Sequence, residues 1–385
     1  MTRRVRALLV GPLPRAGTAI GGTQVSFQQL GERLRARGHV DLEIIDTTRV
    51  RGHKRAWERW LVDGLHAIRI AARVYRLGRT NDVIMFNASS DGFLLGGSVV
   101  SVAAKAVGRP LIARAFGGGL DEALASKSMP LRWLARNTVL RAELVLLQTR
   151  ALCESLGALS EVRHLPTSRV LPSRAPRASP SCRKFLMLAQ LRPEKGYGEA
   201  LAAIERLPDD CSLTIAGPAM PGTDVALLRS STRARWIGDV APSDVSDLLA
   251  EHDALVLPTY HSGEGLPGSI IEAFQHGLPV VATRWRALPE LVQHAVNGLL
   301  VEPRDVEGLA NAMRRLAEEP SLFTELRDGA LSSGREHSAE EAAARVEGWL
   351  SQLAGIPLPA SKSSLSHDAI TPALPTAMRT EAHRP

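Results

Sequence analysis

The sequence is poor in cysteine and has no long apolar run, and each absence excludes a class of protein. Its 385 residues include three cysteines, Cys153, Cys182 and Cys211, which are odd in number and far apart, so neither a disulfide framework nor a thiolate metal site is indicated. The longest weakly polar stretch, 92–104, is shorter than the roughly 20 residues that cross a bilayer. The apolar run 7–10 is too short for a signal peptide. We therefore expect a cytoplasmic protein.

Aromatic residues and lysine are scarce as well. Aromatic residues make up 4% of the chain and no recognised nucleic-acid-binding module is present, so we expect no nucleic-acid partner. Charge, by contrast, is abundant and uneven. Residues 1–180 hold 28 basic against 13 acidic side chains, a net charge of +15, whereas residues 181–385 hold 19 against 27, a net charge of −8. The first half is expected to face an anionic partner, such as a membrane surface or a phosphorylated substrate.

Short apolar runs alternate with helical patterns along most of the chain. The runs predicted to be strands are 5–10, 39–46, 82–86, 110–115, 144–147, 184–188, 212–216, 235–237, 254–257 and 279–282. Such alternation predicts an α/β protein with two Rossmann-like domains, each a doubly wound parallel sheet. Ligands of such sheets bind beyond the carboxyl ends of the strands, so the cleft between the two domains is the expected site.

Composition places the domain boundaries. Residues 1–165 form the predicted first domain, and the four prolines of residues 166–182 indicate a linker. Residues 183–355 form the predicted second domain, whose closing helices are 305–317 and 338–353, with the last a candidate to pack back on the first domain. The segment 356–385 is rich in Pro, Ser, Thr and Ala and is predicted to be a disordered tail.

The stretch 254–283 is the most informative for function. A strand is followed by a polar loop with Glu264, and a helix that begins near Pro267 contains Glu272. The helix start, with glycines on either side of it, offers unpaired N–H groups to which a phosphate could bind. On spacing alone, an ordinary strand–loop–helix with a capping carboxylate explains the pattern equally well.

The segment EGLPGSIIEAFQHGLPVVAT resembles the E-x7-E signature of retaining glycosyltransferases of family 4, which have the GT-B fold. The resemblance extends through LAQLRPEKGYGEAL, LTIAGP, WIGDV and the GGTQVSFQQLGERLRARGH loop and helix, and it covers residues 5–350. It implies that Glu272 binds the ribose hydroxyls of a nucleotide-sugar donor and that Glu264 contacts the transferred sugar. It also implies that Lys195 binds the departing diphosphate, so Lys195 and Glu264 are the expected catalytic residues.

The remaining donor-binding residues implied by the resemblance lie in loops of both domains. They are Gly21, Gly22, Gln190, Arg192, Val240, Gly265 and Leu266. Gln190 departs from the family pattern, which has an arginine five residues before the lysine, and Arg192 is a candidate to take over that charge. Asn87 and Asp121 are candidate acceptor contacts. Gly117 to Gly119 occupy the region where many relatives have a histidine, so no catalytic histidine is assigned.

The resemblance implies transfer with retention of anomeric configuration, without a metal or other cofactor. No residue is placed as a covalent nucleophile, which favours a front-face reaction in which the leaving diphosphate assists deprotonation of the acceptor. A carbohydrate or lipid-linked acceptor in surface polysaccharide or glycolipid assembly fits this chemistry. The alternatives are a nucleotide-sugar epimerase or hydrolase on the same scaffold, and a non-catalytic nucleotide-sugar-binding subunit.

Two stretches of the first half combine basic residues with tryptophan and leucine. Residues 49–79 hold nine Arg or Lys against two acids, and residues 127–141 hold four. Basic faces of this kind suit helices that lie on an anionic membrane, although a core helix with a solvated basic face explains either stretch. We expect peripheral association with the inner face of the cell membrane.

Overall fold

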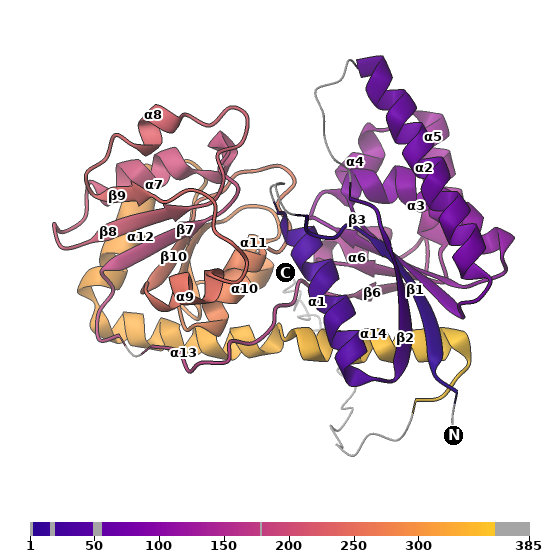
Figure 1. Ribbon diagram of the computed structural model, residues 1–385. Helices are drawn as coiled ribbons and strands as arrows, with labels where there is room; N and C mark the ends of the chain where they lie inside the picture. Colours follow the sequence, from indigo (N-terminus) through magenta and orange to yellow (C-terminus); the bar gives the residue numbers. More distant parts are fainter. Residues whose placement is uncertain (1–2, 16–19, 49–55, 178, 359–385) are drawn as a thin grey trace, which may run out of the picture.

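Two parallel six-stranded sheets, each covered by helices on both faces, form the two lobes of the protein in the computed structural model (Figure 1). The structure describes residues 3–15, 20–48, 56–177 and 179–358. The strand order is β2-β1-β3-β4-β5-β6 in the first sheet and β12-β11-β10-β7-β8-β9 in the second. The α/β fold with two Rossmann-like sheets, predicted from the alternation of apolar runs, is confirmed.

The first sheet consists of continuous apolar strands, as expected where both faces are covered. Its strands are β1 (Val5–Gly11), β2 (Val40–Asp46), β3 (Val83–Ser89), β4 (Leu111–Phe116), β5 (Leu144–Leu147) and β6 (Val162–His164). One face packs against α2 (Ala56–Gly78), α3 (Ser90–Ala106), α4 (Leu120–Ser126), α5 (Met129–Asn137), the 3-10 helix η1 (Val139–Arg141) and α6 (Arg150–Leu156). The opposite face packs against α1 (Gly22–Arg37) and α14 (Ala339–Ala354).

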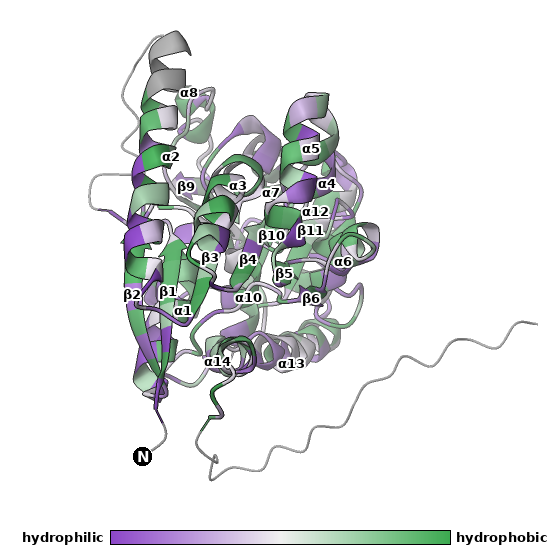
Figure 2. Ribbon diagram, turned by 90° about the vertical axis from the view of Figure 1, so that its right-hand side faces the viewer, coloured by the Kyte–Doolittle hydropathy of each residue, from purple (hydrophilic) through white to green (hydrophobic). Residues whose placement is uncertain are grey.

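The second sheet is built in the same way. Its strands are β7 (Lys184–Leu188), β8 (Ser212–Ala216), β9 (Ala234–Trp236), β10 (Ala254–Leu257), β11 (Val280–Thr283) and β12 (Gly298–Val301). One face packs against α7 (Tyr197–Ile204), α8 (Val225–Leu228), α12 (Val306–Glu318) and the start of α13 (Pro320–Glu336). The other packs against α9 (Val245–Ala250), α10 (Gly268–Gln275) and α11 (Leu288–Leu291). Figure 2, in which the first lobe faces the viewer, shows its strands between α3 and α5 above and α14 below.

The last helix belongs to the first lobe although it follows the second lobe in the sequence. Along the lower edge of Figure 1, α13 runs under the second sheet and α14 under the first. Val346 and Leu350 of α14 are fully buried in one cluster with Phe27 and Leu34 of α1. The chain therefore passes between the lobes twice, before β7 and before α14. The predicted tail 356–385 lies outside the described residues from 359 onward.

The two crossings lie side by side. Arg169, in the segment between β6 and β7, forms a parallel bridge with Ser338, just before α14. Its backbone N–H donates to the carbonyl of His337 at 2.9 Å, and the N–H of Ala339 donates to the carbonyl of Arg169 at 2.8 Å. The backbone of Arg169 is thereby held at the junction of the lobes.

Candidate functional site

A cleft with a cavity of about 600 Å³ separates the carboxyl ends of the two sheets. Its walls are loops that follow strands: Gly21 and Gly22 come after β1, Gly117 after β4, Gln190 after β7 and Val240 after β9. This is the edge of a doubly wound sheet where ligands bind, because the loops and the first turns of the helices converge there. The volume is typical of a site for a small ligand.

Lys195 and Glu264 form a buried ion pair in the wall of the second lobe. The Lys195 Nζ lies 2.6 Å from the Glu264 Oε2, and their side chains are 15% and 8% exposed. Thr259 Oγ1 donates a hydrogen bond to the same carboxylate oxygen at 2.7 Å. Lys195 ends the 3-10 helix η2 (Pro193–Lys195), which follows β7. Burial, and after it the charge of Lys195, lowers the pKa of His261 in the same loop, which favours a neutral imidazole at neutral pH.

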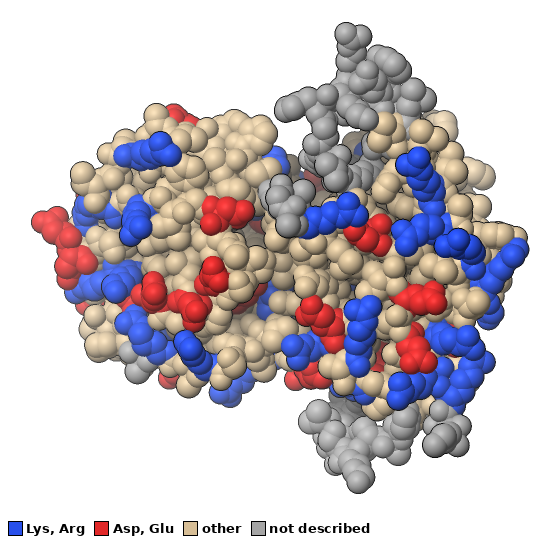
Figure 3. Space-filling model, viewed as in Figure 1, with Lys and Arg blue, Asp and Glu red and all other residues tan. Residues whose placement is uncertain are grey.

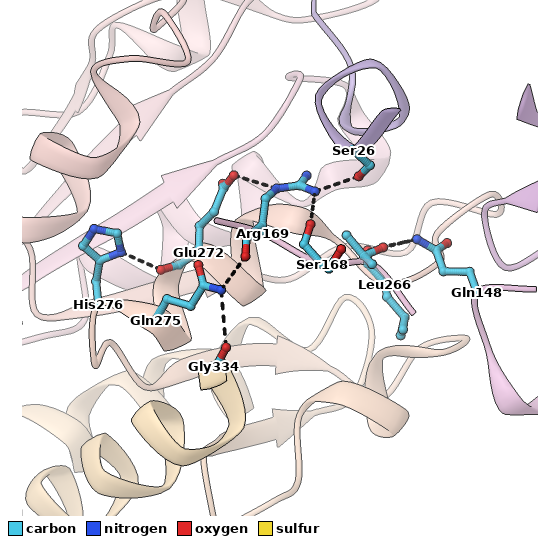
Figure 4. A network of polar contacts seen from close by, with 10 residues as sticks. Ser26, Gln148, Ser168, Arg169, Leu266, Glu272, Gln275, His276 and Gly334 are labelled. Atoms are coloured by element: carbon cyan, nitrogen blue, oxygen red, sulfur yellow. Dashed lines mark hydrogen bonds and ion pairs between the residues drawn. The ribbon is translucent and has the colours of Figure 1, made fainter. Parts of the chain in front are cut away.

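Glu272 lies one helical turn inside α10 and is bound by an arginine from the inter-lobe segment (Figure 4). The Arg169 Nε donates to the Glu272 Oε1 at 2.7 Å, and the Arg169 Nη1 donates to the hydroxyl of Ser26 on α1 at 2.7 Å. The carbonyl of Arg169 accepts a hydrogen bond from Gln275 Nε2 at 3.1 Å. One side chain thus connects the two lobes across the base of the cleft.

The start of α10 faces the cleft and carries the first-turn N–H groups that a helix leaves unpaired. Glycine at 268 leaves the space that Arg169 fills, since a Cβ there would lie 1.7 Å from the Arg169 Nη2. From the other lobe, Gly21 and Gly22 lead into α1, whose own first turn lines the same cavity. Two helix N-termini therefore point at one space, an arrangement that favours an anionic ligand.

The loops of the two lobes touch beside Glu264. A Cβ on Gly118 would lie 2.3 Å from the carbonyl oxygen of Glu264, so only glycine fits between the backbones. Gln148 Oε1 accepts a hydrogen bond from the Gly117 N–H at 2.8 Å, and Thr167 Oγ1 donates to the carbonyl of Leu266 at 2.8 Å. These contacts place the loop 263–268 against the first lobe.

A buried arginine lies behind the wall of the first lobe. Arg114, on β4, is 2% exposed, and its guanidinium stacks on the ring of Phe116, which lines the cleft, at 4.4 Å. Burial, followed by the charges of Arg169 and Arg345, lowers the pKa of Arg114 to about 9. Its Nη2 donates to the carbonyl of Pro166 at 3.3 Å, and within the described part of the chain no carboxylate pairs with it. Arg114 therefore adds a buried positive charge behind the cleft wall, besides the charged side chains that line the cleft.

The structure brings together most of the residues expected at the donor site. The cleft is lined by Gly21, Gly22, Gln190, Lys195, Val240, Glu264, Gly265, Leu266 and Glu272. Arg192 is not among the lining residues. No group of three or more His, Cys, Asp or Glu side chains placed to hold a metal ion occurs in the described part of the chain.

The two candidate acceptor contacts lie away from the cleft lining. Asn87 is 0% exposed, because strand alternation turns it to the same face of β3 as Val83 and Met85, under α1 and α14. Both polar atoms of its amide lack a hydrogen-bond partner among the described residues. Asp121 is exposed on α4 and accepts a hydrogen bond from the N–H of Glu122.

Sequence reasoning missed Arg169, Ser26, Gln148 and Thr167. Arg169 lies in a proline-rich segment whose composition indicates only a linker, and its partners are 143 and 103 residues away in the chain. No local spacing links these residues. Only the register of the linker against residues 337–339 places Arg169 in the cleft.

The two facing sheets and the cleft between them define the GT-B fold of glycosyltransferases. The structure of HepE from Anabaena, described as a complex with UDP, superposes with a TM-score of 0.70 over 90% of this chain and 100% of that one, at 17% sequence identity. Identity at this level shows the shared fold. Residues 182–319 match the family model of glycosyl transferases group 1, and this region contains Lys195, Glu264 and Glu272.

Two curated relatives resemble part of the chain. The glycogen synthase of Mycobacterium tuberculosis is 33% identical over 159 residues, which cover 39% of this chain and 37% of the relative. The amylovoran biosynthesis glycosyltransferase AmsK of Erwinia amylovora is 30% identical over 146 residues, which cover 35% of this chain and 36% of the relative. The chain thus matches little more than a third of the length of each.

Proposed function

We propose that this protein is a retaining glycosyltransferase of family 4 that moves a sugar from a nucleotide-sugar donor to an acceptor hydroxyl in polysaccharide or glycolipid assembly. The observation that carries the proposal is that Lys195, Glu264 and Glu272 line one cleft where two helix N-termini converge. The match of residues 182–319 to glycosyl transferases group 1 and the UDP in the complex of HepE support it.

The chemistry proposed for the cleft needs no covalent intermediate. A carboxylate has two acceptor oxygens, and Arg169 binds Glu272 Oε1. Glu272 Oε2 accepts no hydrogen bond from the described residues and would bind a ribose hydroxyl. Lys195 donates to the departing diphosphate, while Glu264 accepts hydrogen bonds from the transferred sugar. The diphosphate oxygen receives the acceptor's proton as the new bond forms on the same face of the sugar. On this proposal the protein contributes positioning and charge stabilisation, with no metal or other cofactor.

A ligand screen tests the donor class. The full chain is heated with UDP-, GDP- and ADP-sugars, and we expect one nucleotide series to raise the melting temperature, because a ligand at 100 times its Kd stabilises by about 2.7 kcal/mol. Release of the nucleoside diphosphate is then measured, and NMR of the product reports its anomeric configuration. Stabilisation should be lost in Glu272→Gln. If no nucleotide sugar changes the melting temperature of the wild type, the proposal is wrong.

We further propose that the first lobe lies on an anionic membrane, where a lipid-linked acceptor would be found. Neighbouring helices expose large apolar side chains: Leu65 and Ile68 on α2 are 54% and 65% exposed, and Met129 and Trp133 on α5 are 75% and 67% exposed. Figure 2 shows α2, α3 and α5 side by side at one end of the lobe, and basic side chains gather over α2 in Figure 3. No described helix is long and apolar enough to cross a bilayer. Part of the predicted basic stretch, residues 49–55, lies outside the described residues.

Vesicle flotation tests this surface. The protein is expected to float with vesicles that contain anionic phospholipid and to remain in solution with neutral ones. Trp133→Glu should reduce flotation severalfold, because it places a negative charge where an apolar ring would enter the interface. Val296→Glu, at an exposed apolar position of the second lobe (50% exposed, against 67% for Trp133), is the control and should float normally. Equal flotation of the two variants, or none of the wild type, would contradict the proposal.

A further inference from the structure

The cleft presents an amide, not a cation, at position 190, where a diphosphate is proposed to bind. Gln190 follows β7 and lines the cleft, and its Nε2 donates to the carbonyl of Ile20 at 3.1 Å, beside Gly21. An amide can donate a hydrogen bond to phosphate but cannot neutralise its charge. Lys195 and Arg15 also line the cleft, but Lys195 is paired with Glu264 and Arg15 with Asp46. A diphosphate bound by Gln190 and these two paired cations alone would be poorly compensated.

The Nη2 of the Arg169 guanidinium is available to a ligand in the cleft. Its side chain is 4% exposed, its Nε binds Glu272 and its Nη1 binds Ser26, but within the described contacts its Nη2 donates to no acceptor. The Nη2 lies beside the first residue of α10, 1.7 Å from an ideal Cβ on Gly268, and 3.7 Å from one on Gly22. It therefore lies between the two helix N-termini that face the cleft.

We propose that Arg169 binds the donor diphosphate through Nη2 and supplies the positive charge that Gln190 lacks. This inference rests on the proposed function. A guanidinium has a fixed planar fork, so Nε can hold a carboxylate while Nη2 binds a phosphate oxygen. One residue then contacts both Glu272, which takes the ribose, and the phosphates. Arg169 would therefore fix the position of the phosphates relative to the ribose.

The surroundings favour this role. The backbone of Arg169 is fixed on both sides by residues 337–339, so the side chain has a rigid base. Its single described carboxylate partner is Glu272, and the positive charges of Arg169 and Arg345 both act on the buried Arg114. An incoming dianion relieves this excess of positive charge. Ser26 adds a contact from the first lobe, so the same arginine binds both lobes.

Calorimetric titration of the full chain with nucleosides, monophosphates and diphosphates of uridine, guanosine and adenosine tests the inference. For the nucleotide that binds the wild type, Arg169→Gln should weaken the diphosphate by about 10- to 100-fold, because a hydrogen bond to a charged group is lost. The nucleoside should be weakened by less than about threefold. Arg169→Gln/Gln190→Arg should regain much of the diphosphate affinity. Arg174→Gln, an exposed arginine of the same linker, is the control and should bind as the wild type.

The outcomes separate the two proposals. If the wild type binds no nucleotide, the proposed function and this inference both fail. If the wild type binds but Arg169→Gln retains its diphosphate affinity, or loses nucleoside affinity to the same extent, Arg169 does not bind the phosphates and only this inference fails. If Arg169→Gln does not fold, the diphosphate affinity of the single variant Gln190→Arg tests the inference instead. A gain in diphosphate affinity below about threefold supports a cation already in place, and a gain above about tenfold overturns it.

Discussion

Lys195→Ala is expected to lower the rate of sugar transfer by roughly 10²- to 10³-fold, the usual effect of removing one preorganised group that stabilises developing charge. The leaving diphosphate gains negative charge as the glycosidic bond breaks, and on our proposal the Lys195 ammonium faces it. The KM for the donor should rise less than kcat falls, because the ground-state diphosphate keeps the helix N-termini and Arg169. Steady-state kinetics with the donor found in the ligand screen give both values.

Two controls accompany this variant. Removing Lys195 leaves the buried Glu264 carboxylate with the Thr259 hydroxyl as its one side-chain partner among the described residues, so the melting temperature must be measured to separate folding from catalysis. Lys195→Arg keeps the charge but not the compact ammonium, and it should retain more activity than Lys195→Ala. A well-folded Lys195→Ala enzyme with a rate within tenfold of wild type would rule out the proposed role.

Gly118→Ala is expected to reduce transfer by about 100-fold, because a displacement of about 1 Å in an active site has effects of that size. A Cβ at this position would lie 2.3 Å from the Glu264 carbonyl oxygen, so the loops of the two lobes must move apart. The φ of Gly118 is not in the left-handed region, so alanine adds no backbone strain. The melting temperature should change little, because the clash is between lobes rather than within a core.

The matched control for this substitution is Gly348→Ala on α14, where nothing lies within 4 Å of the added Cβ. It should leave the rate unchanged and stabilise the helix slightly. A Gly118→Ala enzyme with normal kcat and normal donor KM would show that the close approach of the loops is not needed for transfer.

Short apolar runs that end at glycine, proline or polar residues made most of the strands predictable. The runs 144–147, 184–188, 212–216 and 254–257 coincide with β5, β7, β8 and β10. The sequence did not reveal β6, a short edge strand whose central residue, Arg163, is exposed. It also did not reveal α13, whose helical pattern is weakened by Gly329, Gly334 and three serines.

Some residues of the candidate site could likewise be predicted from the sequence, and others could not. Lys195, Glu264 and Glu272 lie in one continuous stretch of recognisable motifs, so their shared place in the cleft could be expected. Arg169 could not, because its position depends on a bridge to residue 338, and long-range register of this kind leaves no periodic trace. For Asn87 the direction of the strand was predictable, but not that α1 and α14 would cover the face on which it lies.

The position of α14 late in the sequence affects the order in which the two lobes can fold during synthesis. One apolar face of the first sheet is completed by Ala343, Val346 and Leu350, which are translated after the whole second lobe. Domains usually fold in the order in which they leave the ribosome. Here Leu9, Phe27 and Leu34 of the first lobe cannot pack against α14 until that helix has emerged, so we expect the second lobe to complete its fold before the first.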